Sequence, residues 1–254
     1  RMKSIKSHIT QLLKSLNEGV FEKEHTIALS LLSAMAGESI FLLGPPGVAK
    51  SLVARRLKLA FKDADAFEYL MSRFSTPDEI FGPVSISKLK DEDTYERITK
   101  GYLPTASIVF LDEIWKDGPA IQNSLLTVIN EKIYRNGQFT VKVPLKVLIA
   151  ASNELPAKGE GLEALYDRFL IRQFVGCIEQ EFAFDRMIAS TKDTEPNIPE
   201  KLPIEQEEYC KMQAEAETVT LHYTFFELVH TIKRTVEQLS LIHISEPTRL
   251  GMIS

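Results

Sequence analysis

Cysteine is scarce in this chain of 254 residues, which has only Cys177 and Cys210 and no CxxC pair. Two cysteines so far apart, with no pair of histidines beside them, argue against a disulfide framework and against a structural zinc site. Such low cysteine use is typical of a reducing compartment, so we expect a cytoplasmic protein.

Long apolar runs and excess positive charge are also missing. No stretch approaches the roughly 18 apolar residues that a membrane span needs. The chain has 30 Lys and Arg against 35 Asp and Glu, a net charge of -5. Because nucleic-acid binders usually carry a basic surface, this balance argues against a nucleic-acid partner. The 44% hydrophobic content is ordinary for a globular protein.

Short apolar runs alternate with helical patterns through most of the chain. The runs lie at 39–43, 67–71, 108–111, 147–151 and 170–175, and helical patterns precede them at 4–17 and 24–36. Continuous apolar runs between helices are typical of parallel strands covered on both faces. The sequence therefore predicts an α/β fold, with a five-stranded parallel sheet between helices. Five phenylalanines lie in or beside these runs and are expected in the core: Phe41, Phe67, Phe110, Phe169 and Phe174.

Two segments interrupt the alternation, and both are predicted to be hairpins. Residues 83–98 have the polar tip Lys90-Asp91-Glu92-Asp93, and residues 133–143 contain Asn136-Gly137, a strong hairpin signal. After about residue 180 the pattern is helical only, with predicted helices near 204–217 and 223–239. We therefore divide the chain into an α/β domain over 1–178 and a partial all-α domain over 179–239.

The last fifteen residues, 240–254, fit none of these patterns. They read SLIHISEPTRLGMIS and resemble a translated sequencing-adapter read-through. The alternative is a genuine strand-and-turn tail. We interpret the segment as non-native and leave it out of the functional argument.

A glycine-rich loop follows the first predicted strand and leads into a helix. The loop and the first helical residues are Gly44, Pro45, Pro46, Gly47, Val48, Ala49, Lys50, Ser51 and Leu52. Strand, loop, Lys-Ser and helix form the context of a phosphate-binding loop, in which backbone N–H groups surround a phosphate. Lys50 would contact the β- and γ-phosphates of a nucleotide, and the Ser51 hydroxyl would bind Mg²⁺. The usual motif has glycine at position 49, and alanine is tolerable there if its backbone is right-handed helical.

Two carboxylates, Asp112 and Glu113, end the predicted strand at 108–111. The carboxyl ends of parallel strands line the ligand crevice of such a sheet. Asp112 would hold Mg²⁺ through water, and Glu113 would polarise the attacking water. The alternative is that both are acids favoured by a helix dipole.

Asn153 and Arg168 complete the candidate set. Asn153 follows the strand at 147–151 and could orient the lytic water, although an asparagine in a plain turn is the alternative. Arg168 precedes the fifth strand. From there its side chain is better placed to reach the site of a neighbouring subunit than the site of its own chain. Its alternative is a surface ion pair with Asp167. Trp115 could contact a partner or simply pack.

Taken together, these motifs resemble the MoxR family of AAA+ ATPases, most closely its RavA (regulatory ATPase variant A) branch. The resemblance covers about residues 5–239. It is carried by GPPGVAKS (44–51), FEYLMSRFSTPDEIFGP (67–83), IVFLDEIWKDGPAIQNSLL (108–126), AASNELP (150–156) and LEALYDRFLIR (162–172).

The resemblance implies a role for each motif. Residues 44–51 would be Walker A, Asp112-Glu113 Walker B, Asn153 sensor 1 and Arg168 an arginine finger acting in trans, with Arg172 as the alternative. It also implies that His25 flanks the adenine and that the two predicted hairpins line a central pore. The helical domain would be a truncated lid, in which no residue can be assigned as sensor 2.

The function implied is Mg²⁺-dependent ATP hydrolysis in a hexameric ring. Such a ring remodels partner complexes like a chaperone and acts with a partner that carries a von Willebrand A-type domain, while the client stays unknown. One alternative is a nucleotide-dependent scaffold with negligible turnover. Another is a DNA-translocating relative, against which the net charge argues.

Overall fold

The computed structural model describes residues 2–116, 118–157, 159, 161–190 and 196–238. The described residues up to Cys210 form one compact unit, and those from Lys211 onward form a second. Among the described residues, no helix combines the length and the apolar character needed to cross a membrane. The segment 240–254, interpreted above as non-native, lies outside the described residues.

Five strands form one parallel sheet in the order β2-β3-β6-β1-β7, which confirms the predicted sheet. The strands are β1 (Ile40–Leu43), β2 (Ala66–Leu70), β3 (Ile108–Asp112), β6 (Val147–Ser152) and β7 (Ile171–Phe174). β1 is an inner strand, and its Ile40 pairs with Ile149 of β6 and with Ile171 of β7.

Successive residues of the inner strands are buried in two different cores, one on each face of the sheet. In β3, Ile108 and Phe110 belong to one core, and Val109 and Leu111 to the other. Because side chains alternate across a strand, a strand buried on both faces must be apolar at every position. This is why the sequence runs are continuous rather than alternating.

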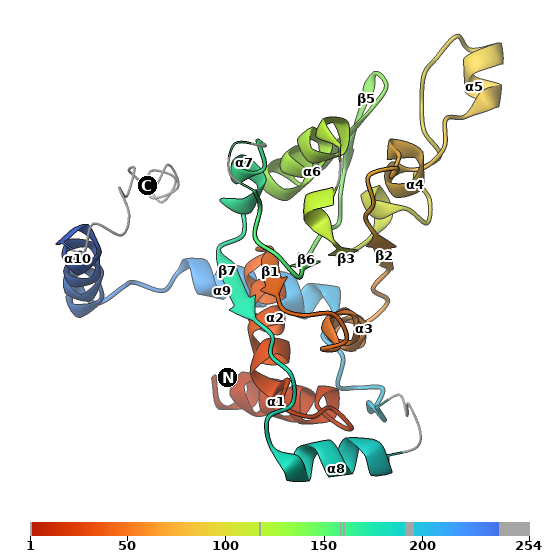
Figure 1. Cartoon of the computed structure of the whole chain (residues 1–254). Coiled ribbons are helices and arrows are strands. Elements are labelled where there is room, and N and C mark those ends of the chain that lie inside the picture. The colour runs from red at the N-terminus through yellow and green to blue at the C-terminus, as the bar shows by residue number, and fades with distance from the viewer. Residues whose placement is uncertain (1, 117, 158, 160, 191–195, 239–254) are drawn as a thin grey trace. The chain divides into compact units, whose positions relative to one another are not determined.

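Helices cover both faces of the sheet, as predicted (Figure 1). The first face carries α1 (Met2–Leu16), α2 (Glu24–Ala36) and α3 (Lys50–Lys58), whose buried residues share one core. The second face carries α4 (Pro77–Phe81), α6 (Pro119–Glu131) and α7 (Glu163–Tyr166). Short 3-10 helices, Leu103–Thr105 and Ile114–Lys116, precede and follow β3.

The segment 83–98 is not a two-stranded hairpin, so that prediction was wrong. Its base is paired, with an antiparallel bridge between Val84 and Arg97, but its outer part contains the helix α5 (Ile86–Asp91). The Ser85 side chain accepts a hydrogen bond from the backbone N–H of Lys88 and caps this helix. Ile86 and Leu89, three residues apart, therefore lie on one helical face rather than alternating as in a strand. We call residues 83–98 the α5 insert.

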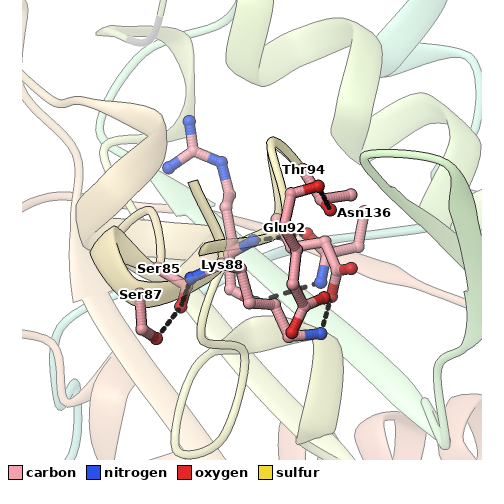
Figure 2. A network of polar contacts seen from close by, with 8 residues as sticks. Ser85, Ser87, Lys88, Glu92, Thr94 and Asn136 are labelled. Atoms are coloured by element: carbon pink, nitrogen blue, oxygen red, sulfur yellow. Dashed lines mark hydrogen bonds and ion pairs between the residues drawn. The ribbon is translucent and has the colours of Figure 1, made fainter. Parts of the chain in front are cut away.

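The second predicted hairpin is confirmed as β4 (Ile133–Asn136) and β5 (Phe139–Lys142). It packs against the base of the α5 insert, and Figure 2 shows Asn136 among the polar residues of that insert. The backbone N–H of Arg97 donates to Asn136 Oδ1 at 2.7 Å, and Asn136 Nδ2 donates to the Arg97 carbonyl at 3.0 Å. The hairpin and the insert, distant in sequence, are therefore joined by one side chain.

The chain after the sheet contains α8 (Glu181–Ala189), α9 (Gln206–Glu217) and α10 (Tyr223–Gln238). The first turn of α9 belongs to the larger unit, where Tyr209 is buried and its hydroxyl donates to the Ala34 carbonyl. The Lys146 ammonium lies 4.1 Å from the centre of the Tyr209 ring and bonds to Gln206. Burial lowers the pKa of Lys146. The division of the chain at residue 178 stays a prediction.

Candidate functional site

The carboxyl ends of β1, β6 and β3 meet at one edge of the sheet, as the parallel topology requires. Leu43 pairs with Ser152, and Leu111 pairs with Ala150. By the same register, Gly44 lies level with Asn153, and Asp112 lies level with Ala151, two residues or about 7 Å before Asn153 along β6. With strands about 4.8 Å apart, Gly44 and Asp112 are separated by about 10 Å across the sheet. Three of the predicted motifs are thus brought together.

Gly44 begins the loop at a point where the backbone is crowded. Its N–H donates to the Ser152 carbonyl at 3.1 Å. A Cβ added there would lie 2.1 Å from the Val175 carbonyl oxygen, which leaves room only for glycine. The loop is therefore anchored at its start by β6 on one side and by the residue after β7 on the other. The sequence did not identify Val175, which has no chemical signature of its own.

Lys50 is buried at the first position of α3, with 7% of its surface exposed. Its ammonium donates to the carbonyls of Gly44 at 2.6 Å and Pro45 at 3.1 Å. A buried ammonium bonded only to loop carbonyls lacks the full charge compensation that an anion would supply. The arrangement therefore suits a phosphate placed inside this loop.

Two residues of the loop have left-handed backbone angles, Gly47 with φ +81° and Ala49 with φ +62°. A Cβ at Gly47 would meet nothing within 4 Å, so its glycine serves conformation rather than space. Alanine at position 49 was expected to need a right-handed helical backbone, and Ala49 does not have one. An L-residue in this region costs about 1–2 kcal/mol, which the surrounding loop must supply.

Asp112 ends β3 and lies beside the end of β2, where its carbonyl accepts the Met71 N–H at 2.9 Å. Its carboxylate oxygen Oδ1 accepts the backbone N–H of Glu113 at 3.0 Å. The second oxygen of Asp112 is not used by that bond. A half-buried carboxylate at a strand end, with one oxygen available, suits a magnesium ion coordinated through water.

Glu113 also has a left-handed backbone, with φ +54°. This turn sends the chain into the 3-10 helix Ile114–Lys116, and the Lys116 N–H returns to the Glu113 carbonyl at 3.0 Å. As a result, the Lys116 ammonium lies 3.0 Å from Glu113 Oε2. That oxygen is buried and makes no hydrogen bond within the described part of the chain. Nothing in the sequence pattern singles out Lys116.

Trp115 packs rather than projecting toward a partner, which settles its two alternatives. It is 8% exposed and contacts the rings of Phe41, Tyr166 and Phe169. Its indole Nε1 donates to the Glu154 carbonyl at 3.0 Å. The indole thereby connects the turn after Glu113 with the loop after Asn153.

Asn153 itself is exposed at the end of β6. Its amide makes no hydrogen bond to any other described residue, whereas the neighbouring Ser152 hydroxyl accepts the Glu154 N–H at 3.2 Å. A turn asparagine that stabilised its own loop would bond to nearby backbone groups. The amide is therefore available to a molecule at the sheet edge.

Arg168 and Arg172 differ in how they are held. The Arg172 guanidinium lies 3.9 Å from the centre of the Tyr166 ring, donates to two carbonyls and pairs with Asp167. Arg168 is half-buried, and its side chain makes no hydrogen bond or ion pair among the described residues. The predicted Asp167–Arg168 pair is thus replaced by Asp167–Arg172.

The segment before α2 is tied to the chain that follows β7. Lys23 is buried and its ammonium donates to the Gly176 carbonyl at 3.1 Å. The Glu22 carboxylate accepts the N–H groups of Glu179 and Gln180, at 2.8 and 2.9 Å, and these bonds lower the pKa of Glu22. His25 is exposed in the first turn of α2, next to this junction. A buried lysine so close to a sequence turn could not be predicted from the pattern.

The donors at the sheet edge suit a nucleotide with a magnesium ion better than a metal bound by protein alone. No group of three or more His, Cys, Asp or Glu side chains that could hold a metal was found among the described residues. Ser51 and Asp112 supply one hydroxyl and one carboxylate, which matches the habit of Mg²⁺ to take a few protein ligands plus phosphate and water oxygens.

Comparisons with known proteins agree with this arrangement. Residues 7–214 match the family described as the MoxR domain in the MoxR-vWA-beta-propeller ternary systems. The chain is 42% identical over 245 residues to the uncharacterized protein MJ0079 of Methanocaldococcus jannaschii, covering 96% of this chain and 62% of that protein. It is 45% identical over 208 residues to MJ0812 of the same organism, covering 82% of this chain and 54% of that protein.

More distant matches extend the comparison. The structural protein ORF618 of Acidianus two-tailed virus is 32% identical over 178 residues, covering 69% of this chain and 29% of that protein. The crystal structure of a "putative ATPase" from Cytophaga hutchinsonii superimposes with a TM-score of 0.67 at 20% identity, covering 87% of this chain and 68% of that one. The latter likeness concerns the fold alone. The chain spans less than two thirds of the two M. jannaschii proteins.

Proposed function

Since the chain belongs to the MoxR family of AAA+ ATPases, we propose that it binds ATP with Mg²⁺ at the sheet edge and hydrolyses the terminal phosphate. One observation carries this proposal: the loop after β1, the carboxylates after β3 and Asn153 after β6 share one edge of one parallel sheet.

Each residue at that edge has a separate part in the proposal. Backbone N–H groups at the start of α3 and the Lys50 ammonium bind the β- and γ-phosphates. Ser51 and Asp112 would hold Mg²⁺, which when bound would supply positive charge to the phosphate oxygens. Glu113 accepts a hydrogen bond from the attacking water, and the Asn153 amide orients the same water. His25 lies beside the adenine.

We place Arg168 in the site of a neighbouring subunit, within a ring that we propose to be hexameric. Its half-buried guanidinium without a described partner supports this, because an uncompensated cation at a surface is suited to an anion supplied from outside. Arg172, the alternative, has its guanidinium engaged with Tyr166, Phe169 and Asp167. We therefore favour Arg168.

The energy of hydrolysis would remodel partner complexes, together with a partner that carries a von Willebrand A-type domain. Support for this partner comes from the description of the matching family, which names MoxR, vWA and beta-propeller proteins. The likeness to the RavA branch stays a prediction. A scaffold with negligible turnover is the second candidate.

The test is Mg²⁺-dependent ATP hydrolysis per protomer as a function of protein concentration. We expect the specific rate to rise with concentration, because a site completed by Arg168 of a neighbour requires assembly. A near-zero rate at all concentrations, with measurable nucleotide binding, would favour the scaffold. Salt-sensitive binding of single-stranded DNA would instead favour a DNA-translocating protein.

A further inference from the structure

The Glu113 carboxylate has an unusual environment for a group that must meet water. Its side chain is 18% exposed, and Oε2 is buried without a hydrogen bond to any described residue. The Lys116 ammonium lies 3.0 Å from that oxygen. We propose that Lys116 is a positioning residue, which holds the Glu113 carboxylate in place for hydrolysis. This inference rests on the function proposed above.

The position of Lys116 is fixed by the fold rather than by chance contact of two flexible side chains. The left-handed turn at Glu113 and the 3-10 helix after it return Lys116 to Glu113 within three residues. Ile114 is completely buried and Trp115 is bonded to the Glu154 carbonyl. With its two preceding neighbours held in the core, the Lys116 backbone cannot swing away from Glu113.

The contact matters because the carboxylate is mostly removed from water. Among the residues that the structure describes, Lys116 is the one ion-pair partner recorded for Glu113. A buried carboxylate that loses its partner is left uncompensated, and it turns toward solvent. That movement removes it from the place where it would orient the attacking water.

The geometry of the pair also leaves Glu113 able to act. Lys116 lies at ion-pair distance without forming an aligned hydrogen bond, since Oε2 has none. The ammonium faces Oε2, whereas Oε1 makes no hydrogen bond to a described residue and stays available to water. With 43% of its side chain exposed, Lys116 can also shift when a phosphate or a neighbouring subunit approaches.

The experiment compares Lys116→Met with Lys116→Arg in the full chain. Methionine keeps an apolar stem of similar reach and removes the charge, and arginine restores it. Binding of a fluorescent ATP analogue, the single-turnover rate of ATP cleavage and the thermal midpoint are measured for each. Lys58→Met is the control, because Lys58 is an exposed lysine at the far end of α3.

We expect Lys116→Met to cleave ATP roughly five- to tenfold more slowly while its affinity for the analogue stays unchanged and its thermal midpoint stays above the assay temperature. Lys116→Arg should recover most of the rate, and Lys58→Met should equal the wild type. An unchanged or faster rate in Lys116→Met, or a slow Lys116→Arg, would overturn the inference. If the wild type does not hydrolyse ATP at any concentration, the proposed function fails instead.

Discussion

The Asn136 side chain pairs with both backbone polar groups of Arg97, 39 positions away, as a neighbouring strand would. Asn136 is 7% exposed, and a Cβ at the next residue, Gly137, would lie 2.0 Å from the Tyr95 carbonyl oxygen. The β4–β5 hairpin and the α5 insert are therefore fitted to each other without space for slippage.

Asn136→Ala is expected to destabilise the fold by about 1–3 kcal/mol, because it leaves an N–H and a carbonyl of Arg97 without partners in a buried place. Urea unfolding measures this free energy. Thr140→Ala, on the exposed part of β5, is the matched control and should change it by less than about 0.5 kcal/mol. Equal effects in the two variants would mean that the Asn136–Arg97 pairing is unimportant.

Glu113→Gln and Lys50→Ala should separate binding from turnover. The glutamine keeps shape but cannot accept the proton of the attacking water, so turnover should fall by roughly 10²-fold or more while ATP affinity is retained. Lys50→Ala removes a phosphate contact and should weaken affinity by roughly 10- to 100-fold as well. Equilibrium binding and steady-state hydrolysis measure the two effects. Equal loss of affinity in both variants would contradict the role proposed for Glu113.

Arg168→Ala should lower turnover by about 10³-fold or more without changing ATP affinity, if its guanidinium acts in a neighbour's site. Mixing this variant with Glu113→Gln should restore part of the hydrolysis. An intact site then forms where Arg168 of one protomer meets the intact Glu113 of the other. No recovery on mixing would argue for action within one chain.

Arg172→Ala is the comparison for that experiment. It removes the stacking on Tyr166 and two bonds to carbonyls, so it should lower the thermal midpoint. Its ATP turnover under conditions where it is folded should exceed that of Arg168→Ala.

Ala49→Gly should stabilise the fold by about 0.5–1 kcal/mol, because glycine adopts φ +62° without the steric cost that alanine has. Ala28→Gly, in the middle of α2, is the control, for which the opposite effect on stability is expected. It should destabilise by about 1 kcal/mol, since right-handed helix disfavours glycine. Chemical denaturation of both variants measures the difference, and a loss of stability in Ala49→Gly would show that its strain is not relieved.

The stability of the contact between the Glu22 carboxylate and the backbone of residues 179 and 180 should depend on pH. Backbone hydrogen bonds lower the pKa of Glu22 below 4.5 in the fold. Its contribution to stability is therefore fully present above 4.5 and is lost as the pH falls through the lowered pKa. Protection of the Glu179 and Gln180 amides from hydrogen exchange, corrected for intrinsic rates, should fall over that range. In Glu22→Gln the protection of these two amides should be weaker at neutral pH, and it should not change over the acidic range.

The strands and the phosphate loop could be predicted because their signals are local. A strand covered on both faces must be continuously apolar, and Asn136-Gly137 favours a tight turn whatever surrounds it. The α5 insert was misjudged because Ser85 caps a helix of only six residues, too short to show periodicity. Its paired base did follow the hairpin expectation.

Features that depend on distant parts of the chain could not be predicted. Phe41, Phe110 and Phe169 are in the core as expected, but Phe174 is 64% exposed because β7 is an edge strand with β1 as its only described neighbour. The left-handed Ala49, the buried Lys23 and the contact of Lys116 with Glu113 arise from tertiary packing or from backbone angles that residue type does not reveal. These roles of single residues are visible only in the folded chain.

Trp115 is the only tryptophan of the chain, and its indole touches the turn after Glu113 and the loop after Asn153 at once. Indole fluorescence responds to polarity and to the loss of a hydrogen bond, so the intrinsic fluorescence of Trp115 can be used to monitor this region. Excitation at the red edge of protein absorbance would report a change at this contact in real time, in an unlabelled protein and without any added dye.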